Sequence, residues 1–157
     1  MQFLAEYQEA EREAELARLR RLLALRAMVA AGMRQRHIAD ALGIGQPAVS
    51  QQLQSSEALT DVHPEVLLEA AAPILTHIAE GRGFTRLAVF GSVARHSARR
   101  ESDIDLLVAP PPDMSISDLL AVRDLFEQVL GRPVDLITYG GLKPGLDDDI
   151  SREAVLL

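Results

Sequence analysis

The sequence predicts a helical N-terminal domain followed by a small α/β domain, in which helices flank a mixed β-sheet. Three observations support this fold class. Residues 1–60 show only the apolar spacing of helices, strand-length apolar runs begin after Gly81 and Gly83, and these runs alternate with a further helical pattern. A chain of 157 residues has room for one ordinary domain or two small ones. We expect the helical domain over residues 1–60, a linker and helix over 61–72, and the α/β domain over 73–157.

The first part is expected to form three helices. Residues 3–31 lack Pro and Gly, carry leucines at steps of three and four, and are followed by Gly32. A second helix fits residues 35–42. After a glycine turn, a third helix begins near Pro47, where a missing N–H costs little. The polar residues 55–64 are the expected linker.

The second part mixes helices with strands. A helical pattern over residues 65–79 contains Pro73, which we expect to break or kink the helix. The tail over residues 146–157 is expected to be a short helix with an acidic first turn. Between them, apolar spacing predicts three strands and one helix: residues 87–90, 104–109 and 134–138 for the strands, and 117–130 for the helix.

The composition is that of a globular protein without cysteine. Hydrophobic residues make up 48% of the chain and charged residues 25%, which excludes an intrinsically disordered composition. The lack of Cys excludes disulfides, a cysteine nucleophile and thiolate zinc sites. No apolar run approaches the roughly 18 residues of a membrane span, and the N-terminus lacks the apolar stretch of a signal peptide. We therefore expect a cytoplasmic protein.

Arginines in the N-terminal part suit an anionic partner. The net charge is −7, yet the stretch from Arg18 to Arg36 contains six Arg and no acid. Further along, Ala39, Gly43 and Val49 supply a small residue, a turn residue and an apolar plug at the spacing of a helix-turn-helix. The candidate DNA-contacting residues are two arginines placed for phosphates and four polar residues of the third helix: Arg34, Arg36, Gln46, Ser50, Gln51 and Gln54.

Residues 34–53 resemble the helix-turn-helix of bacterial repressors, which implies binding to operator DNA. The alternative is an ordinary helical hairpin whose Gly and Ala serve packing alone. Because such modules usually read two half-sites, we expect a homodimer, with the leucine rows of the long first helix as its seam. Core packing of residues 16–31 within the chain is the alternative for those leucines.

Two acids stand where the second predicted strand begins. Asp103 and Asp105 flank Ile104, and strand alternation places both carboxylates on one face, on the order of 7 Å apart at the backbone. Like charges on one face oppose folding, whereas a divalent cation between them would neutralise both. Asp135 begins the third predicted strand and could face the same site. Three carboxylates can hold two Mg²⁺ ions about 4 Å apart.

A glycine–serine pair follows the first predicted strand. Gly91 permits close approach of a phosphate, and the Ser92 hydroxyl with the free N–H groups at a helix start can hold phosphate oxygens. Arg95, one helical turn later, could add a charged clamp. Ten residues separate Ser92 from Asp103.

The pattern Gly-Ser-x10-Asp-x-Asp followed by a later strand Asp resembles the DNA polymerase β-like nucleotidyltransferases, in particular their minimal members. The resemblance covers residues 73–157, including the tail Ile150 to Val155. It implies that Gly91 and Ser92 bind the triphosphate of ATP or another nucleotide. It also implies that Asp103 and Asp105 are Mg²⁺ ligands and that Asp135 is the third acid, which helps to activate the nucleophile. One departure is His96, where the family often has Gly.

Minimal nucleotidyltransferases resemble antitoxins that transfer AMP from ATP to a tyrosine of a HEPN-type ribonuclease toxin, encoded by the adjacent gene. The resemblance therefore implies an antitoxin that is a Mg²⁺-dependent nucleotidyltransferase and also represses its own operon. One alternative is a transcriptional regulator whose α/β domain only binds a nucleotide or partner. A second is a nucleotidyltransferase for small molecules such as antibiotics. Those enzymes usually carry a further helical domain, and only 22 residues follow Asp135 here.

Overall fold

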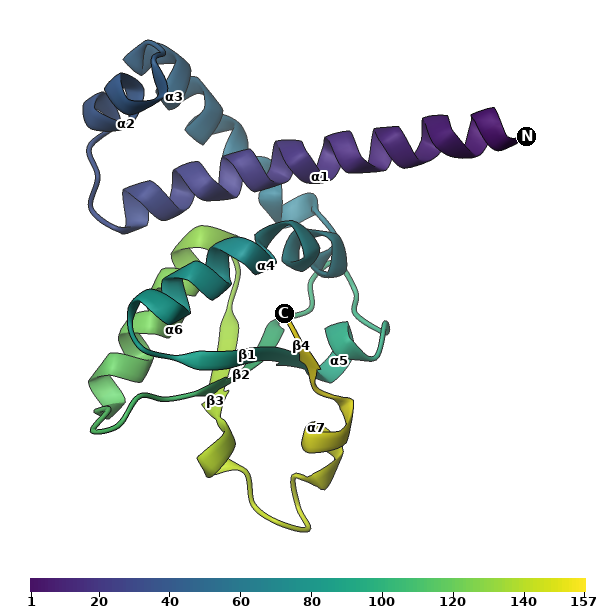
Figure 1. Ribbon diagram of the computed structural model, residues 1–157, viewed down its shortest axis with the longest axis vertical. Coiled ribbons are helices and arrows are strands. Elements are labelled where there is room, and N and C mark those ends of the chain that lie inside the picture. The colour runs from purple at the N-terminus through teal and green to yellow at the C-terminus, as the bar shows by residue number, and fades with distance from the viewer.

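The computed structural model describes the backbone of all 157 residues and the side chains of residues 1–55 and 59–157. Helices come first and strands follow (Figure 1). The helices are α1 (Gln2–Ala30), α2 (Gln35–Leu42), α3 (Gln46–Gln54), α4 (Pro64–Gly81), α5 (Gly91–Ala94), α6 (Ile116–Leu130) and α7 (Asp148–Glu153), with short 3-10 turns η1 (Ser55–Asp61) and η2 (Tyr139–Gly141). The strands are β1 (Thr85–Phe90), β2 (Ile104–Ala109), β3 (Val134–Thr138) and β4 (Val155–Leu156).

Helix α1 belongs to both halves of the molecule. Its middle carries buried leucines, among them Leu19 and Leu23, into the same core as α4, α6 and the sheet. Its C-terminal part packs Leu25 against α2 and α3. The Arg26 guanidinium donates to the carbonyls of Gln128 and Val129 at 2.7 and 2.8 Å, which ties α1 to the end of α6. The leucine rows are thus buried within the chain, and the expectation that they form a dimer seam is wrong.

Helices α2 and α3 form a compact pair on the C-terminal end of α1. Gly43 ends α2 in the left-handed conformation (φ 69°), and Pro47 lies in the first turn of α3, as expected. Ile38, Ala39 and Val49 are buried between α1, α2 and α3. In Figure 1 this pair stands at one end of α1, whereas the N-terminal turns of α1 project away from the body at the other end.

Helix α4 runs without interruption from Pro64 to Gly81, so the expected break at Pro73 does not occur. Pro73 lies on the exposed side of the helix. Leu67, Ala71 and Leu75 are fully buried on its other side, beneath α1. This packing holds α4 in one piece although the proline removes one helical hydrogen bond.

The sheet has the order β3-β2-β1-β4. Strand β1 pairs antiparallel with β2 and with β4, while β2 and β3 are parallel. Helices α4 and α6 cover one face, with α1 above them, and α7 with the preceding loop lies against the other face (Figure 1). The predicted mixed sheet flanked by helices is confirmed. The tail differs from the expected single helix, because α7 is followed by β4.

Side-chain alternation divides the strands between two apolar clusters. Ile104, Leu106 and Val108 of β2 face the helices, whereas Leu107 faces α7 together with Ala88 and Phe90. Local signals fix α6, which begins at a capping box of Ser115 and Asp118 and ends at Gly131 in the left-handed conformation.

None of the helices in the described part of the chain combines the length and the apolar character that spanning a bilayer requires.

Candidate active site

The acids converge where β2 and β3 begin. In the parallel register, Asp105 is the direct partner of Asp135, and neighbouring strands lie about 4.8 Å apart. Asp105 also pairs with Phe90, the last residue of β1. Because Ile104 and Leu106 point into the core, Asp105 and its partner Asp135 lie on the opposite face of the sheet. Asp103, exposed just before β2, completes the cluster.

At Asp105, burial and neighbouring carboxylates outweigh the effect of the nearby Arg95. Burial raises the pKa of Asp105, and repulsion from Asp135 and Asp103 raises it further. Arg95 acts in the opposite direction, while Glu153 adds to the rise. A group that is costly to ionise in a folded protein gains most from a bound cation, so the electrostatics favour a cation at Asp105.

Three carboxylates are the donor set that Mg²⁺ prefers, and in that respect the residues fit the ion. Among the described side chains, however, no group of three His, Cys, Asp or Glu is placed to hold a metal ion by itself. The carboxylates therefore form an open set, and phosphate oxygens of a bound nucleotide are natural further ligands. Asp105, its register partner Asp135 and the adjacent Asp103 are the residues that would hold the ion.

Gly91 lies directly against Asp105. It follows β1 with φ 71°, a conformation that L-residues rarely adopt. A Cβ at this position would overlap the Asp105 carboxylate, with Cγ of Asp105 only 3.1 Å away. The sequence suggested that Gly91 allows a phosphate to approach. The structure shows a further reason for glycine, which is that Asp105 needs the space.

Ser92 and Arg95 follow on the short helix α5. The Ser92 side chain is half-buried. The Nη1 of Arg95 pairs with the Glu153 carboxylate at 2.9 Å, and the Arg95 side chain remains 54% exposed. Glu153 also accepts a hydrogen bond from the Gly91 N–H at 2.9 Å. The sequence showed Glu153 only as part of the tail, since no local pattern indicates a contact across 62 residues.

The loop between α5 and β2 is shaped by two residues. His96 adopts φ 58°, a conformation in which glycine is unstrained, and its ring nitrogen lies 3.2 Å from Glu65. Arg132 donates to the carbonyls of Arg100 (2.8 Å) and Ser102 (3.3 Å), and also to that of Val62 (2.8 Å). Through these bonds Arg132 holds the loop that presents Asp103.

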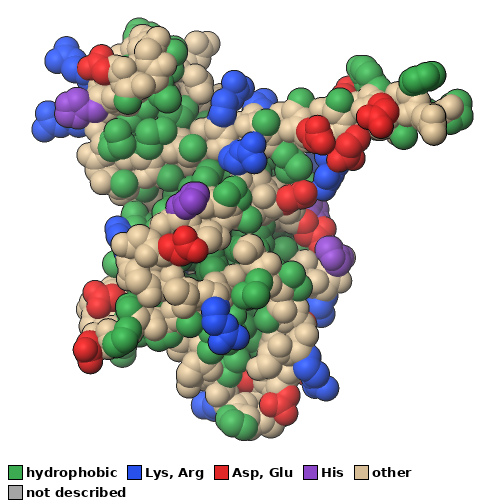
Figure 2. Space-filling model, in the orientation of Figure 1, with side chains coloured by type: hydrophobic (Ala, Val, Ile, Leu, Met, Phe, Trp, Pro, Cys, Tyr) green, Lys and Arg blue, Asp and Glu red, His purple; other side chains and the backbone are tan. Residues whose placement is uncertain are grey.

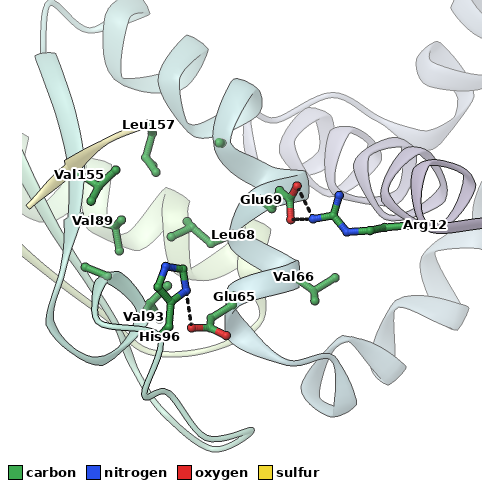
Figure 3. Close-up of a pocket in the computed structure, with 12 residues that line it drawn as sticks. Arg12, Glu65, Val66, Leu68, Glu69, Val89, Val93, His96, Val155 and Leu157 are labelled. Atoms are coloured by element: carbon green, nitrogen blue, oxygen red, sulfur yellow. Dashed lines mark hydrogen bonds and ion pairs between the residues drawn. The ribbon is translucent and has the colours of Figure 1, made fainter. Parts of the chain in front are cut away.

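Two hollows lie on either side of α5. One is an open groove of 600 Å³, lined by Arg95, Asp149, Ile150, Arg152 and Glu153. The other is a cavity of 440 Å³ behind α5, between α4 and β4, rimmed by the ion pairs Arg12–Glu69 and His96–Glu65 (Figure 3). The three aspartates line neither of these two hollows.

The candidate DNA-contacting residues lie together on α2 and α3, far from the acids. Arg34, Arg36, Gln46, Gln51 and Gln54 are exposed, and Ser50 is half-buried. Figure 2 shows basic side chains at the outer corner of this helix pair, next to an acidic one and a histidine, and acidic side chains along the projecting part of α1.

Comparison with known proteins assigns the α/β half. A model of the nucleotidyltransferase domain matches residues 78–157. A relative from Thermococcus cleftensis, named protein adenylyltransferase MntA, is 34% identical over 92 residues, which are 56% of this chain and 93% of the relative. A relative from Methanocaldococcus jannaschii, provisionally named a protein adenylyltransferase, is 42% identical over 73 residues, or 46% of this chain and 78% of the relative.

A solved structure gives the same result for the fold. It is provisionally described as a minimal nucleotidyltransferase and shares 36% sequence identity with this chain at a TM-score of 0.54. The match covers 59% of this chain and 95% of the other chain. The α/β half thus accounts for nearly all of that neighbour.

Proposed function

Because the chain belongs to the nucleotidyltransferase domain family, we propose that it transfers AMP from ATP to a hydroxyl group of a partner protein, and that it acts in this way as an antitoxin. The observation that carries the proposal is the placement of Asp105 beside Asp135 and Asp103, directly against the Gly91 turn. This joins a cation site to a turn that can hold a phosphate.

Each residue of the site has a role in this reaction. The Ser92 hydroxyl and backbone would hold the triphosphate, and Asp103, Asp105 and Asp135 would hold Mg²⁺. When bound, Mg²⁺ supplies the positive charge that the triphosphate needs in order to be attacked. The acceptor oxygen then bonds to the α-phosphorus, its proton passes to Asp135, and the bond to pyrophosphate breaks.

A protein acceptor is favoured over a small molecule for two reasons. The relatives with the matching domain are named protein adenylyltransferases. In addition, the groove that Arg95, Glu153 and other α7 residues line is open, and two arginines, Arg95 and Arg152, contribute to its lining. An open groove can receive a side chain that is presented by another protein. A HEPN-type toxin encoded by the adjacent gene is the partner we propose.

DNA binding is the second part of the proposal. The paired helices α2 and α3 expose Gln46, Gln51 and Gln54 on one helix, and Arg34 and Arg36 beside it. A glutamine amide can form hydrogen bonds with an adenine edge in the major groove, and an arginine can form them with phosphates. Repression of the operon that encodes both proteins would follow, with a homodimer on two half-sites formed by a surface other than the leucine rows.

Label transfer tests the enzymatic proposal. The protein is incubated with Mg²⁺, ATP labelled at the α-phosphate and the protein encoded by the adjacent gene, and label is followed onto that protein. We expect transfer by the wild type and by E80Q, whose exposed carboxylate lies on α4 at the other end of β1. D103A and D105A should transfer nothing. Nucleotide binding without any transfer would instead support the regulator that only binds a nucleotide.

A further inference from the structure

We propose that Glu153 is a positioning residue for nucleotidyl transfer, which holds the Gly91–Ser92 turn and Arg95 in the arrangement that receives a nucleoside triphosphate. This inference rests on the proposed function of the acidic site. It adds a residue from the last turn of α7, remote in sequence from the glycine–serine and aspartate motifs.

One carboxylate joins two parts of the turn. Oε1 of Glu153 accepts from the Gly91 N–H at 2.9 Å, and both carboxylate oxygens lie within 3.1 Å of Nη1 of Arg95. The Glu153 side chain is only 18% exposed, whereas that of Arg95 is 54% exposed. Partial burial and a charged donor make these bonds stronger than those of a surface ion pair.

The position of Glu153 is fixed by the sheet. Directly after it, Val155 and Leu156 of β4 pair with Val89 and Ala88 of β1. The N–H of Leu157 donates to the carbonyl of Leu87 at 3.0 Å. Ala154 packs against the apolar cluster that contains Phe90. The pairing of β4 with β1 thus fixes the position of the Glu153 carboxylate relative to the last residue of β1. The turn after β1 is held by the strand on one side and by Glu153 on the other.

The contact between Glu153 and Gly91 matters for the reaction because the Gly91 peptide has little room to move. The Asp105 carboxylate fills the space beside Gly91 that a Cβ would occupy, so a rotation of the Gly91 peptide would push against Asp105 or leave a gap beside it. Because the Gly91 N–H is bonded to Glu153, Ser92 is the residue of the turn that remains to bind the nucleotide. Groups that are held in place before the substrate arrives bind it at a lower cost in entropy.

Electrostatics support a positional role for Glu153. It adds a further negative charge beside Asp105, where a triphosphate must also bind. A carboxylate at this place opposes the substrate by its charge alone. Its pairing with Arg95 neutralises most of that charge and keeps the guanidinium against the turn. If position is what Glu153 supplies, glutamine should preserve a large part of its effect, since its amide oxygen can still accept from Gly91.

The test uses the full-length variants E153Q, E153A and R95Q, with E80Q as the matched control on an exposed glutamate. Two properties are measured. The first is the hydrogen-exchange rate of the Gly91 amide without nucleotide, by NMR. The second is the Kd for a non-hydrolysable ATP analogue with Mg²⁺, followed by the kcat and KM of label transfer.

We expect E153A to speed exchange at Gly91 and to weaken analogue binding by about tenfold, as loss of a charged hydrogen bond implies. E153Q should stay protected at Gly91 and bind the analogue with an intermediate Kd. In a double-mutant cycle, R95Q and E153Q should be non-additive, because both remove the same ion pair.

Three results would overturn the inference. Tighter analogue binding by E153A would mean that the carboxylate only blocks the nucleotide. Faster exchange at Gly91 with unchanged Kd and kcat would mean a purely structural brace. Slow exchange at Gly91 in E153A would mean that the contact does not hold the turn. Failure of the wild type itself to bind the analogue would refute the proposed function instead, and the exchange rates would still report on the contact.

Discussion

The carboxylate of Asp105 occupies the space that a Cβ of residue 91 would need, so that Gly91 has no room for a side chain. Gly91 follows directly after β1 and Asp105 lies in β2, and the antiparallel pairing of these strands, in which Phe90 is opposite Asp105, brings the two residues together. The glycine that begins the phosphate-binding turn is therefore also a condition for the placement of a metal-binding carboxylate.

Replacement of Gly91 by alanine should abolish activity while leaving the fold intact. G91A forces a left-handed residue, at a cost on the order of 1 kcal/mol, and drives the Asp105 carboxylate from its place. We expect label transfer to fall by at least about a hundredfold, as for other losses of preorganised charge. The control is G81A at the end of α4, where a Cβ meets nothing within 4 Å. Activity of G91A equal to that of G81A would contradict this account.

The charge of Asp105 should destabilise the metal-free protein. Its folded-state pKa is raised by burial and by repulsion from Asp135 and Asp103. The folded protein therefore holds this proton more tightly than the unfolded chain, and stability is lost as the pH rises from the ordinary carboxyl range through the raised pKa. In D105N a neutral amide replaces the carboxylate, so this loss of stability at neutral pH should disappear.

Thermal melting in the presence of a chelator measures the effect. At neutral pH the Tm of D105N should exceed that of the wild type, because the amide removes the buried charge and its repulsion from Asp135 and Asp103. Near pH 3.5, below the ordinary Asp pKa of about 3.9, the difference should vanish. Mg²⁺ should raise the Tm of the wild type only. A D105N variant that melts below the wild type at neutral pH would refute the repulsion.

Most of the fold could be predicted from the sequence because its signals are local. The boundaries of α2, β2 and β3 follow from glycines and apolar periods within each segment. The path of the chain after α7 could not be predicted, because Val155 and Leu156 are a strand only through their pairing with β1. The continuity of α4 through Pro73 likewise depends on burial against α1 rather than on local propensity.

The site was predictable to the extent that it lies in one motif. Gly91, Ser92, Asp103 and Asp105 stand within 15 residues of one another. The ion pair between Arg95 and Glu153 depends on a contact between distant segments of the chain. No spacing rule reveals such a contact. The same is true of the hydrogen bonds from Arg132 to the loop that carries Asp103.

Removal of Arg132 should loosen the loop that carries Asp103. Its guanidinium donates to the carbonyls of Val62, Arg100 and Ser102, and burial lowers its pKa without removing its charge. R132Q should lower the free energy of unfolding by about 2–3 kcal/mol, since it leaves several carbonyls without a charged donor. Urea denaturation measures this against R82Q, an exposed arginine at the end of α4. Equal stability of the two variants would show that the Arg132 bonds do not hold the loop.

Gln51 should contribute to the reading of operator DNA. It is exposed on α3, and a glutamine amide can bond bidentately to adenine. Q51A should weaken operator binding by about 1–3 kcal/mol at fixed salt. Gel-shift titration against Q8A, on the projecting part of α1, provides the comparison. An unchanged Kd for Q51A would remove α3 as the recognition helix.

The most direct measurement is a crystal structure of the protein with Mg²⁺ and a non-hydrolysable ATP analogue. The account predicts metal ions on Asp103 and Asp105, with Asp135 facing them, and the phosphates of the analogue against Ser92. Nucleotide bound in the cavity behind α5, or metal bound away from these three aspartates, would contradict it.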